Sequence, residues 1–120
     1  MNVHALIIGN NNYEQATKLV NAINDAQGVE QMFKKLGYST TLINDFKKED
    51  IAGILSDLED RLKTNIDVTI FYFAGHAFEV DNNNHIAPVD CPLAGLDRSN
   101  CTHYSLKLKE IIDIFDKSKC

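Results

Sequence analysis

The sequence predicts an α/β domain with a mostly parallel sheet that helices cover on both faces. Short, almost continuously apolar runs alternate with longer segments in which apolar residues recur every three or four positions. Strands that are apolar along their whole length are typical of a sheet buried on both faces. Right-handed crossover connections then restrict the order in which such strands can lie. At 120 residues, the chain is long enough for one compact domain with its own core.

The first half of the chain predicts a strand, a helix and a second strand. Residues 3–8 are mainly apolar and β-branched, and Gly9 closes this run together with the asparagines that follow it. A helix is expected from Asn21 to Leu36, with Gly37 as its stop. Residues 38–43 follow as the second strand. The apolar stripe of the helix is formed by Leu19, Ala22, Ile23, Ala26, Val29, Phe33 and Leu36.

The second half continues this alternation. Asp45 is expected to cap a second helix, residues 68–73 predict a third strand, and residues 80–86 predict a small hairpin. If the first strand lies beside the third, the carboxyl ends of both strands share one edge of the sheet with the start of the first helix. The inner face of the second helix is expected to be Ile51, Ile54, Leu55, Leu58 and Leu62, and a last helix is marked by Leu108, Ile111, Ile112 and Phe115.

Composition and charge exclude several classes of partner. The formal net charge is −5 and no basic stripe is present, so neither nucleic acid nor a membrane surface is an expected partner. No apolar segment approaches the roughly 20 residues that a membrane-spanning helix needs. Strand-like sequence begins at Val3 in place of a leader, which favours the cytoplasm. The three cysteines, Cys91, Cys101 and Cys120, form no CxxC pair and are expected to be reduced thiols.

The apolar run over residues 71–74 stops on Gly75 and His76. Such a strand delivers one imidazole to the edge of the sheet at which open α/β folds place their chemistry, which makes His76 the main catalytic candidate. Asp25, on the first predicted helix, is expected to lie beside it. Each residue also has a plainer interpretation: His76 as a loop histidine bonded to the backbone, and Asp25 as a carboxylate paired with a lysine or with backbone N–H groups.

Two other patterns are weak. His85, Cys91, Cys101 and His103 cluster in the sequence, but their spacing matches no common set of metal ligands. Gly9 and the asparagines after it lack the second and third glycines of a dinucleotide fingerprint. Neither a metal nor any other cofactor is therefore expected.

Five motifs, in this order along the chain, resemble those of the caspase-like cysteine peptidases of family C14, and most closely its paracaspase and metacaspase branch. The resemblance implies a caspase-like three-layer sandwich in which residues 1–120 are the large-subunit-like (p20-like) domain. The motifs are Ala5–Asn10 with Tyr13, then Asn21–Ala26, Leu36–Tyr38, Phe71–His76 and Ala87–Asp90.

The resemblance also implies roles for single residues. His76 matches the histidine of the Cys-His dyad. Ala77 stands where the family usually has the second glycine of Gly-His-Gly, and its backbone N–H is the expected donor to the oxyanion. Asp25 matches the acid of the primary specificity pocket, which implies a protein or peptide substrate cleaved after arginine or lysine. Leu19 and Val20 stand in the region where arginines would favour aspartate instead.

The family's nucleophile belongs to a strand that follows the last predicted helix, so we expect the chain to be truncated before that strand, with the cysteine beyond residue 120. Cys120 follows polar residues, and Cys91 and Cys101 lie in predicted loops. Two functional classes result. One is a cysteine endopeptidase; the other is a catalytically inactive module that acts through protein association. A homodimer or a second chain that completes the sheet is expected in both, because the outer edge of the third strand recruits another strand.

Overall fold

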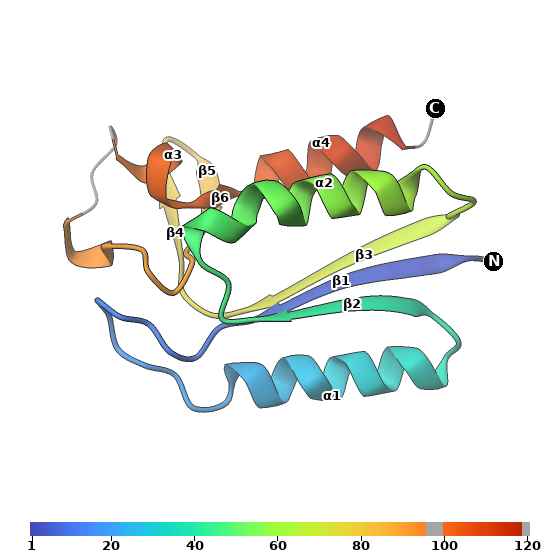
Figure 1. Ribbon diagram of the computed structural model, residues 1–120, viewed down its shortest axis with the longest axis horizontal. Helices are drawn as coiled ribbons and strands as arrows, with labels where there is room; N and C mark the ends of the chain where they lie inside the picture. Colours follow the sequence, from blue (N-terminus) through green and yellow to red (C-terminus); the bar gives the residue numbers. More distant parts are fainter. Residues whose placement is uncertain (96–99, 119–120) are drawn as a thin grey trace.

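The computed structural model describes residues 1–95 and 100–118. In that part of the chain, the central sheet consists of three parallel strands, β1 (Val3–Gly9), β2 (Ser39–Asn44) and β3 (Val68–Ala74). Their order is β2-β1-β3, with β1 in the middle (Figure 1). The predicted parallel sheet is therefore confirmed, as is the expected pairing of the first and third strands.

The register of this sheet brings the carboxyl ends of the strands to one level. Gly9, the last residue of β1, pairs with Asn44 on β2 and with Ala74 on β3. The Asn10 N–H donates a hydrogen bond to the Ala74 carbonyl oxygen (2.9 Å), which continues the pairing by one residue. The segments that follow all three strands therefore begin at the same edge, on the left in Figure 1.

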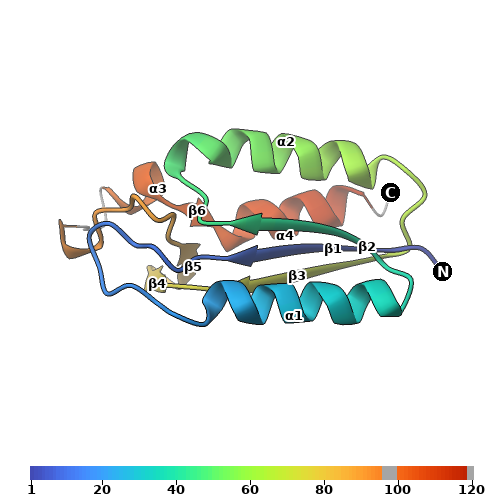
Figure 2. The same ribbon diagram turned by 60° about the horizontal axis from the view of Figure 1, so that its bottom comes forward.

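Helices cover both faces of the sheet, as the sequence predicts (Figure 2). α1 (Ala22–Lys35) packs on one face, and α2 (Ile51–Leu62) and α4 (Leu108–Lys117) lie on the other. Every residue of β1 is buried, which explains why this run is almost wholly apolar. The larger core cluster lies on the α2 and α4 side, and its buried members are Leu6, Ile8, Phe46, Ile54, Leu58, Leu62, Ile86, Leu106, Ile111 and Ile114.

A second, antiparallel sheet lies beyond the carboxyl edge of the first (Figure 1). Its order is β4-β5-β6, formed by β4 (Ala77–Val80), β5 (Asn83–Ile86) and β6 (Leu106–Lys107). Asp81 and Asn82 join β4 to β5 with φ angles of 52° and 65°, the left-handed pair that a tight two-residue hairpin requires. The predicted hairpin is thus confirmed, but it begins at Ala77. The sequence reasoning missed β6 and two short helices, η2 (Leu93–Gly95) and α3 (Cys101–Tyr104).

One expectation about the helices was wrong. Asp45 does not cap α2, because a short helix, η1 (Lys48–Asp50), precedes α2 and the Lys47 N–H donates to the Asp50 carboxylate (2.8 Å). The expected last helix is found as α4, with Ile112 45% exposed. Its buried residues are Ile111 and Ile114, which have the three-residue spacing of one helix face. Among the described residues, no helix combines the length and apolar character needed to cross a membrane.

Gly9 allows the first turn of α1 to approach the end of β1. A Cβ at this position would lie 2.8 Å from the Ala26 Cβ and 2.9 Å from the Ala22 carbonyl oxygen. These distances are shorter than van der Waals contact, so a side chain would push the helix away from the sheet. Because Gly9 has no Cβ, the start of α1 can pack against the carboxyl edge of the parallel sheet.

The substitution Gly9→Ala should lower the free energy of unfolding by about 1–3 kcal/mol, because it overpacks this contact. The matched control is Gly28→Ala, also in α1, where a Cβ meets no atom within 4 Å. That change should raise stability by about 0.5–1 kcal/mol through helix propensity. Urea unfolding of both variants measures the difference, and equal stabilities would contradict the close approach.

Candidate active site

His76 lies in the turn that joins β3 to β4, at the carboxyl edge of the parallel sheet. Its side chain is half-buried. The imidazole Nε2 is 2.8 Å from the carbonyl oxygen of Thr17, in the loop between β1 and α1. A carbonyl oxygen accepts hydrogen bonds and never donates them, so Nε2 carries the proton of the neutral ring. Nδ1 is then the unprotonated nitrogen, and it has no hydrogen-bond partner in the described part of the chain.

This bond to the backbone is also what the plainer interpretation of His76 as a loop histidine expects. The structure fits both interpretations, because a bond to the backbone through Nε2 leaves the other ring nitrogen with a lone pair in either case. A neutral imidazole held in one tautomer can accept a proton at Nδ1 and return it there. The arrangement therefore suits a general base that later acts as a general acid.

The Tyr13 hydroxyl joins the backbone of His76 to the backbone of Ala87. It accepts a hydrogen bond from the His76 N–H (2.8 Å) and donates one to the Ala87 carbonyl oxygen (3.1 Å). The two aromatic rings are 4.4 Å apart between centroids. Burial raises the pKa of the Tyr13 hydroxyl, which therefore stays protonated at neutral pH and can donate. The sequence reasoning cited Tyr13 within a motif but assigned it no function.

The loop that carries Tyr13 and Thr17 is tied to the sheet by Asp45. The Asp45 carboxylate accepts hydrogen bonds from the Asn11 N–H (2.8 Å), the Asn12 N–H (3.1 Å) and the Asn12 side-chain amide (2.7 Å). Burial alone would raise the pKa of Asp45, but these three hydrogen bonds outweigh burial and lower it. Asp45 thus stabilises the loop and not a helix. Its backbone has the left-handed φ of 53°.

Two asparagines of the same loop complete its attachment. The Asn11 side-chain oxygen accepts the Ile23 N–H (3.1 Å) at the start of α1, so this residue caps the helix in place of Asn21. Asn10 is fully buried, donates to the Ala87 carbonyl oxygen (3.1 Å) and accepts from the Phe46 N–H (3.2 Å). In the sequence analysis, these asparagines only close the first strand; a run of asparagines directly after a buried strand is the signal by which this network could have been found.

Ala77 presents a backbone N–H beside His76. It pairs with Ile86 in the β4–β5 ladder, and the adjacent pair is hydrogen-bonded from the Ala87 N–H to the His76 carbonyl oxygen (3.0 Å). Hydrogen-bonded and non-hydrogen-bonded pairs alternate in an antiparallel ladder. The Ala77 N–H therefore points away from β5, toward the outer side of the strand that ends this sheet in the described chain.

Asp25 lies exposed on the first turn of α1. This turn packs against Gly9, so Asp25 belongs to the same edge of the sheet as His76. No hydrogen bond or ion pair joins the two side chains in the described part of the chain, nor does a lysine pair with Asp25 there. The expected shared edge is found, while direct contact between Asp25 and His76 is not.

The described cysteines are not exposed thiols. Cys91 is 1% exposed and Cys101 is 3% exposed. Burial, with a smaller effect of Asp90, raises the pKa of Cys91 to about 11, so its sulfur is protonated at neutral pH. The Cys101 sulfur lies 4.0 Å from Nε2 of the buried His85, and not at His76. Cys120 lies outside the described residues.

The four residues that were weighed as metal ligands are held in different ways. His85 is hydrogen-bonded to Ser105 (2.9 Å) and stacks on Phe78, while His103 lies 2.8 Å from the Lys48 ammonium. Within residues 1–95 and 100–118, no group of three or more histidine, cysteine or acidic side chains is placed to hold a metal ion.

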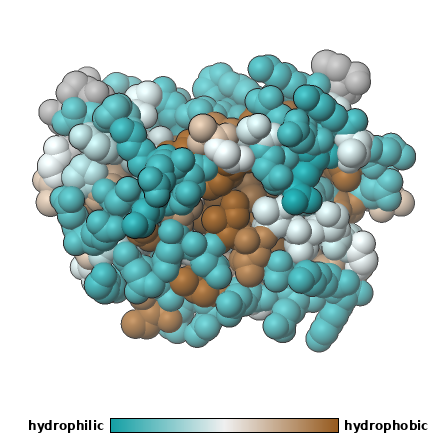
Figure 3. Space-filling model, in the orientation of Figure 1, coloured by the Kyte–Doolittle hydropathy of each residue, from teal (hydrophilic) through white to brown (hydrophobic). Residues whose placement is uncertain are grey.

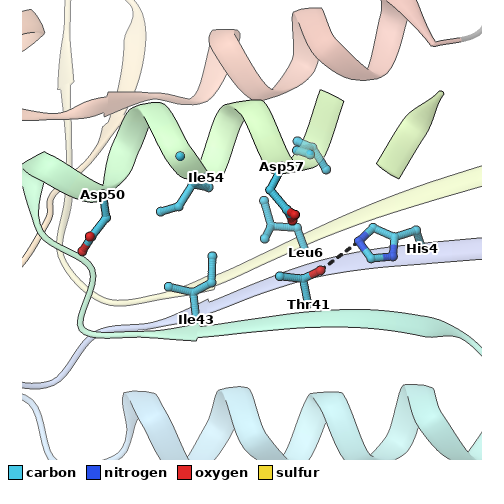
Figure 4. A pocket seen from close by; sticks show the side chains of 9 residues that line it. His4, Leu6, Thr41, Ile43, Asp50, Ile54 and Asp57 are labelled. Carbon is cyan, nitrogen blue, oxygen red and sulfur yellow. Dashed lines mark hydrogen bonds between the residues drawn. The ribbon is translucent and has the colours of Figure 1, made fainter. Parts of the chain in front are cut away.

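A separate hollow of about 430 Å³ lies between α2 and the sheet, beside β2. Figure 4 shows His4, Thr41 and Ile43 on the sheet side and Asp50, Ile54 and Asp57 on the helix side. Apolar side chains gather in the middle of the face of the molecule seen in Figure 3.

Both ring nitrogens of His4 lie near hydroxyl groups, at 2.9 Å from Ser39 and 3.2 Å from Thr41. Burial lowers the pKa of His4, so this imidazole is a neutral structural group.

Comparison with known families identifies the fold. A family model described as the caspase domain of peptidase C14 matches residues 2–119, which is almost the whole chain. The chain belongs to this family. This chain is similar to the human Mucosa-associated lymphoid tissue lymphoma translocation protein 1, with 26% identity over 88 residues, which are 73% of this chain. These residues are 11% of the human protein's own length, so the likeness concerns one domain.

The resemblance drawn from the five motifs is therefore confirmed at the level of the family and the fold. The α/β architecture, with helices on both faces of a parallel sheet, agrees with a caspase domain. Membership also supports a protease as the general class of activity.

Replacing Asp45 with asparagine tests the attachment of the loop in this caspase domain. Asp45→Asn keeps a residue that tolerates a positive φ but removes the charge, so the free energy of unfolding at neutral pH should fall by about 1–3 kcal/mol. The carboxylate has a lowered pKa in the folded state, so its contribution is present above the ordinary value near 4 and is lost as the pH falls through the folded value.

The difference between wild type and Asp45→Asn should accordingly shrink in acid. Chemical denaturation at several pH values measures it. Asp60→Asn is the control, because Asp60 forms an exposed pair with Lys63 (3.4 Å) and should matter little. A pH-independent difference would show that the charge of Asp45 is not what binds the loop.

The burial of Cys91 and Cys101 predicts slow alkylation. In native protein at mildly alkaline pH, both thiols should react with iodoacetamide at least about a hundredfold more slowly than in denaturant, because the thiolate is the reactive form and access is closed. Peptide mapping by mass spectrometry measures each site separately. Rapid native alkylation of Cys91 would mean that it is a candidate nucleophile after all.

Proposed function

We propose that this caspase domain carries the acid–base half of a cysteine endopeptidase that cleaves proteins after arginine or lysine. The observation that supports this most directly is the orientation of the His76 imidazole. Its Nε2 lies 2.8 Å from the Thr17 carbonyl oxygen, and its Nδ1 has no hydrogen-bond partner in the described part of the chain. An imidazole at the carboxyl edge of a parallel sheet, with one nitrogen committed to the protein, matches the histidine of the family's dyad.

In the proposed reaction, Nδ1 of His76 accepts the proton of a cysteine thiol. The thiolate attacks the carbonyl carbon of the scissile peptide bond, and the carbonyl oxygen becomes an oxyanion that the Ala77 N–H stabilises. The imidazolium gives its proton to the leaving amine as the C–N bond breaks, which leaves a thioester. Nδ1 of His76 then takes a proton from water, and the hydroxide attacks the thioester carbonyl carbon. The C–S bond breaks to release the carboxylic acid, and the imidazolium returns its proton to the thiolate.

Asp25 is proposed to bind the basic side chain before the scissile bond. Its carboxylate is exposed on the first turn of α1, at the edge where His76 lies. A carboxylate without an ion-pair partner in the described chain attracts a guanidinium or an ammonium group, and arginine binds such a group with two parallel hydrogen bonds. The chain has a net charge of −5, which further favours basic substrates.

We place the nucleophile outside the described residues, on a strand beyond residue 120. The two described thiols are buried: Cys91 packs in the cluster with Tyr13 and Ala87, and the Cys101 sulfur lies 4.0 Å from Nε2 of His85. β3 ends the parallel sheet in the described chain, so its outer edge has backbone N–H and C=O groups available for one more strand. A cysteine at the end of such a strand would lie beside the turn that carries His76.

The same edge supports the second candidate function, an inactive caspase domain that acts by association. An available edge strand binds an extended segment of another protein through backbone hydrogen bonds. This function requires no nucleophile, and it predicts that the chain forms a complex whether or not His76 is intact.

Cleavage of fluorogenic peptides distinguishes these functions. The domain is assayed as it stands and with the sequence encoded after Cys120, on peptides with arginine, lysine or aspartate before the scissile bond. We expect cleavage after arginine and lysine by the longer chain. His76→Ala should reduce kcat by about 10²–10⁴-fold, the usual contribution of general acid–base catalysis. His103→Ala is the matched control, because His103 contacts Lys48 and not the site.

Asp25→Asn should lower kcat/KM for basic peptides and leave other peptides unaffected, with Asp60→Asn as the control for a lost surface charge. An unchanged preference would remove Asp25 from the specificity pocket. If neither version of the chain cleaves any peptide, the endopeptidase proposal is wrong. Complex formation measured by light scattering would in that case favour the association module.

A further inference from the structure

We propose that Tyr13 is a positioning residue for His76, and that its hydroxyl group, together with its ring, sets the orientation in which the imidazole presents Nδ1. This inference rests on the proposed function of His76, but its structural content concerns the described residues alone. It assigns a specific role in the site to the loop between β1 and α1.

The first step is a closed ring of hydrogen bonds around the histidine. The His76 N–H donates to the Tyr13 hydroxyl (2.8 Å), the hydroxyl donates to the Ala87 carbonyl oxygen (3.1 Å), and the Ala87 N–H donates to the His76 carbonyl oxygen (3.0 Å). Both backbone groups of His76 are therefore satisfied. Because the hydroxyl has one donor and one acceptor at fixed positions, it cannot rotate without breaking a bond.

The second step is the close approach of the hydroxyl to Gly75. A Cβ on Gly75 would lie 2.6 Å from the Tyr13 oxygen and 2.6 Å from the Phe73 ring. The glycine before the histidine is thus required by Tyr13 and Phe73, which occupy the space of its side chain. The hydroxyl can reach the His76 N–H only because this space is open.

The third step is the contact between the two rings. Their centroids are 4.4 Å apart and their planes are inclined by 57°. The phenol ring limits the rotation of the imidazole from one side, and the Thr17 carbonyl oxygen fixes Nε2.

A tyrosine that served only to fill the core would not need this arrangement. Tyr13 packs in a cluster with Ala87 and Cys91, and one hydrogen bond would satisfy its buried hydroxyl. Instead the hydroxyl bonds to two backbone groups, the His76 N–H and the Ala87 carbonyl oxygen, and the ring lies against the imidazole. The residue therefore acts on the position of the catalytic candidate.

The test compares Tyr13→Phe with wild type by NMR. Tyr13→Phe keeps the ring and removes the hydroxyl, so the His76 N–H loses its acceptor. Amide hydrogen exchange at His76 should become faster by about tenfold or more, the usual effect of leaving a buried N–H unpaired. Long-range ¹⁵N–¹H spectra should change from one tautomer, protonated at Nε2, to a mixture.

Tyr38→Phe is the matched control, since Tyr38 packs on Phe33 (5.7 Å) and does not contact His76. It should leave the amide exchange and the tautomer of His76 unchanged. In a version of the chain that cleaves peptides, Tyr13→Phe should lower kcat by about 10-fold or more and leave KM nearly constant, because the ground-state contacts to substrate are intact.

Unchanged exchange and an unchanged tautomer in Tyr13→Phe would overturn the proposal. If Tyr13→Phe does not fold, the wild-type protein decides: rapid exchange at the His76 amide, or protonation at Nδ1, would overturn it, and slow exchange with protonation at Nε2 would support it. The NMR results do not depend on cleavage. A changed tautomer without any peptidase activity would therefore support Tyr13 as a positioning residue and contradict the endopeptidase function.

Discussion

The level register of the parallel sheet is the constraint on which the rest of the structure depends. Gly9, at the end of β1, stands opposite both Asn44 and Ala74, so three connecting segments begin at the same edge. One of them brings Tyr13 and Thr17, another brings Asp45, and the third brings His76. A slip of one strand would move its segment by more than 3 Å, beyond the reach of the hydrogen bonds that join them.

At this edge, polar side chains replace the apolar packing of the sheet. Asn10 is fully buried and satisfied, Asp45 accepts three hydrogen bonds, and no buried side-chain polar atom in the described chain lacks a partner. A buried polar network of this kind specifies one arrangement, since breaking any member leaves a group unpaired. The loop between β1 and α1 is therefore attached to the sheet and to α1 by side-chain hydrogen bonds, although it has no regular structure.

The sequence predicted best what burial on both faces determines. β1 is buried throughout and β3 pairs with it, so both runs were recognisable as strands, and α1 showed its apolar stripe. β6 was missed because two residues carry no periodicity. The role of Asp45 was wrong because an aspartate after a strand fits a helix cap equally well, and only its left-handed φ of 53° distinguishes the two. The role of Tyr13 depends on Ala87, which is 74 positions away, and no local pattern reveals such a contact.

For a caspase domain, the most specific consequence is the state of one imidazole. The bond between Nε2 and the Thr17 carbonyl oxygen, at 2.8 Å, implies that the neutral ring carries its proton on Nε2 and has its lone pair on Nδ1. Neutron diffraction from deuterated crystals at mildly alkaline pH, where imidazoles are neutral, measures this directly. A deuteron on Nε2 directed at Thr17, with none on Nδ1, is the result we predict. A deuteron on Nδ1, or a ring turned away from Thr17, would contradict it.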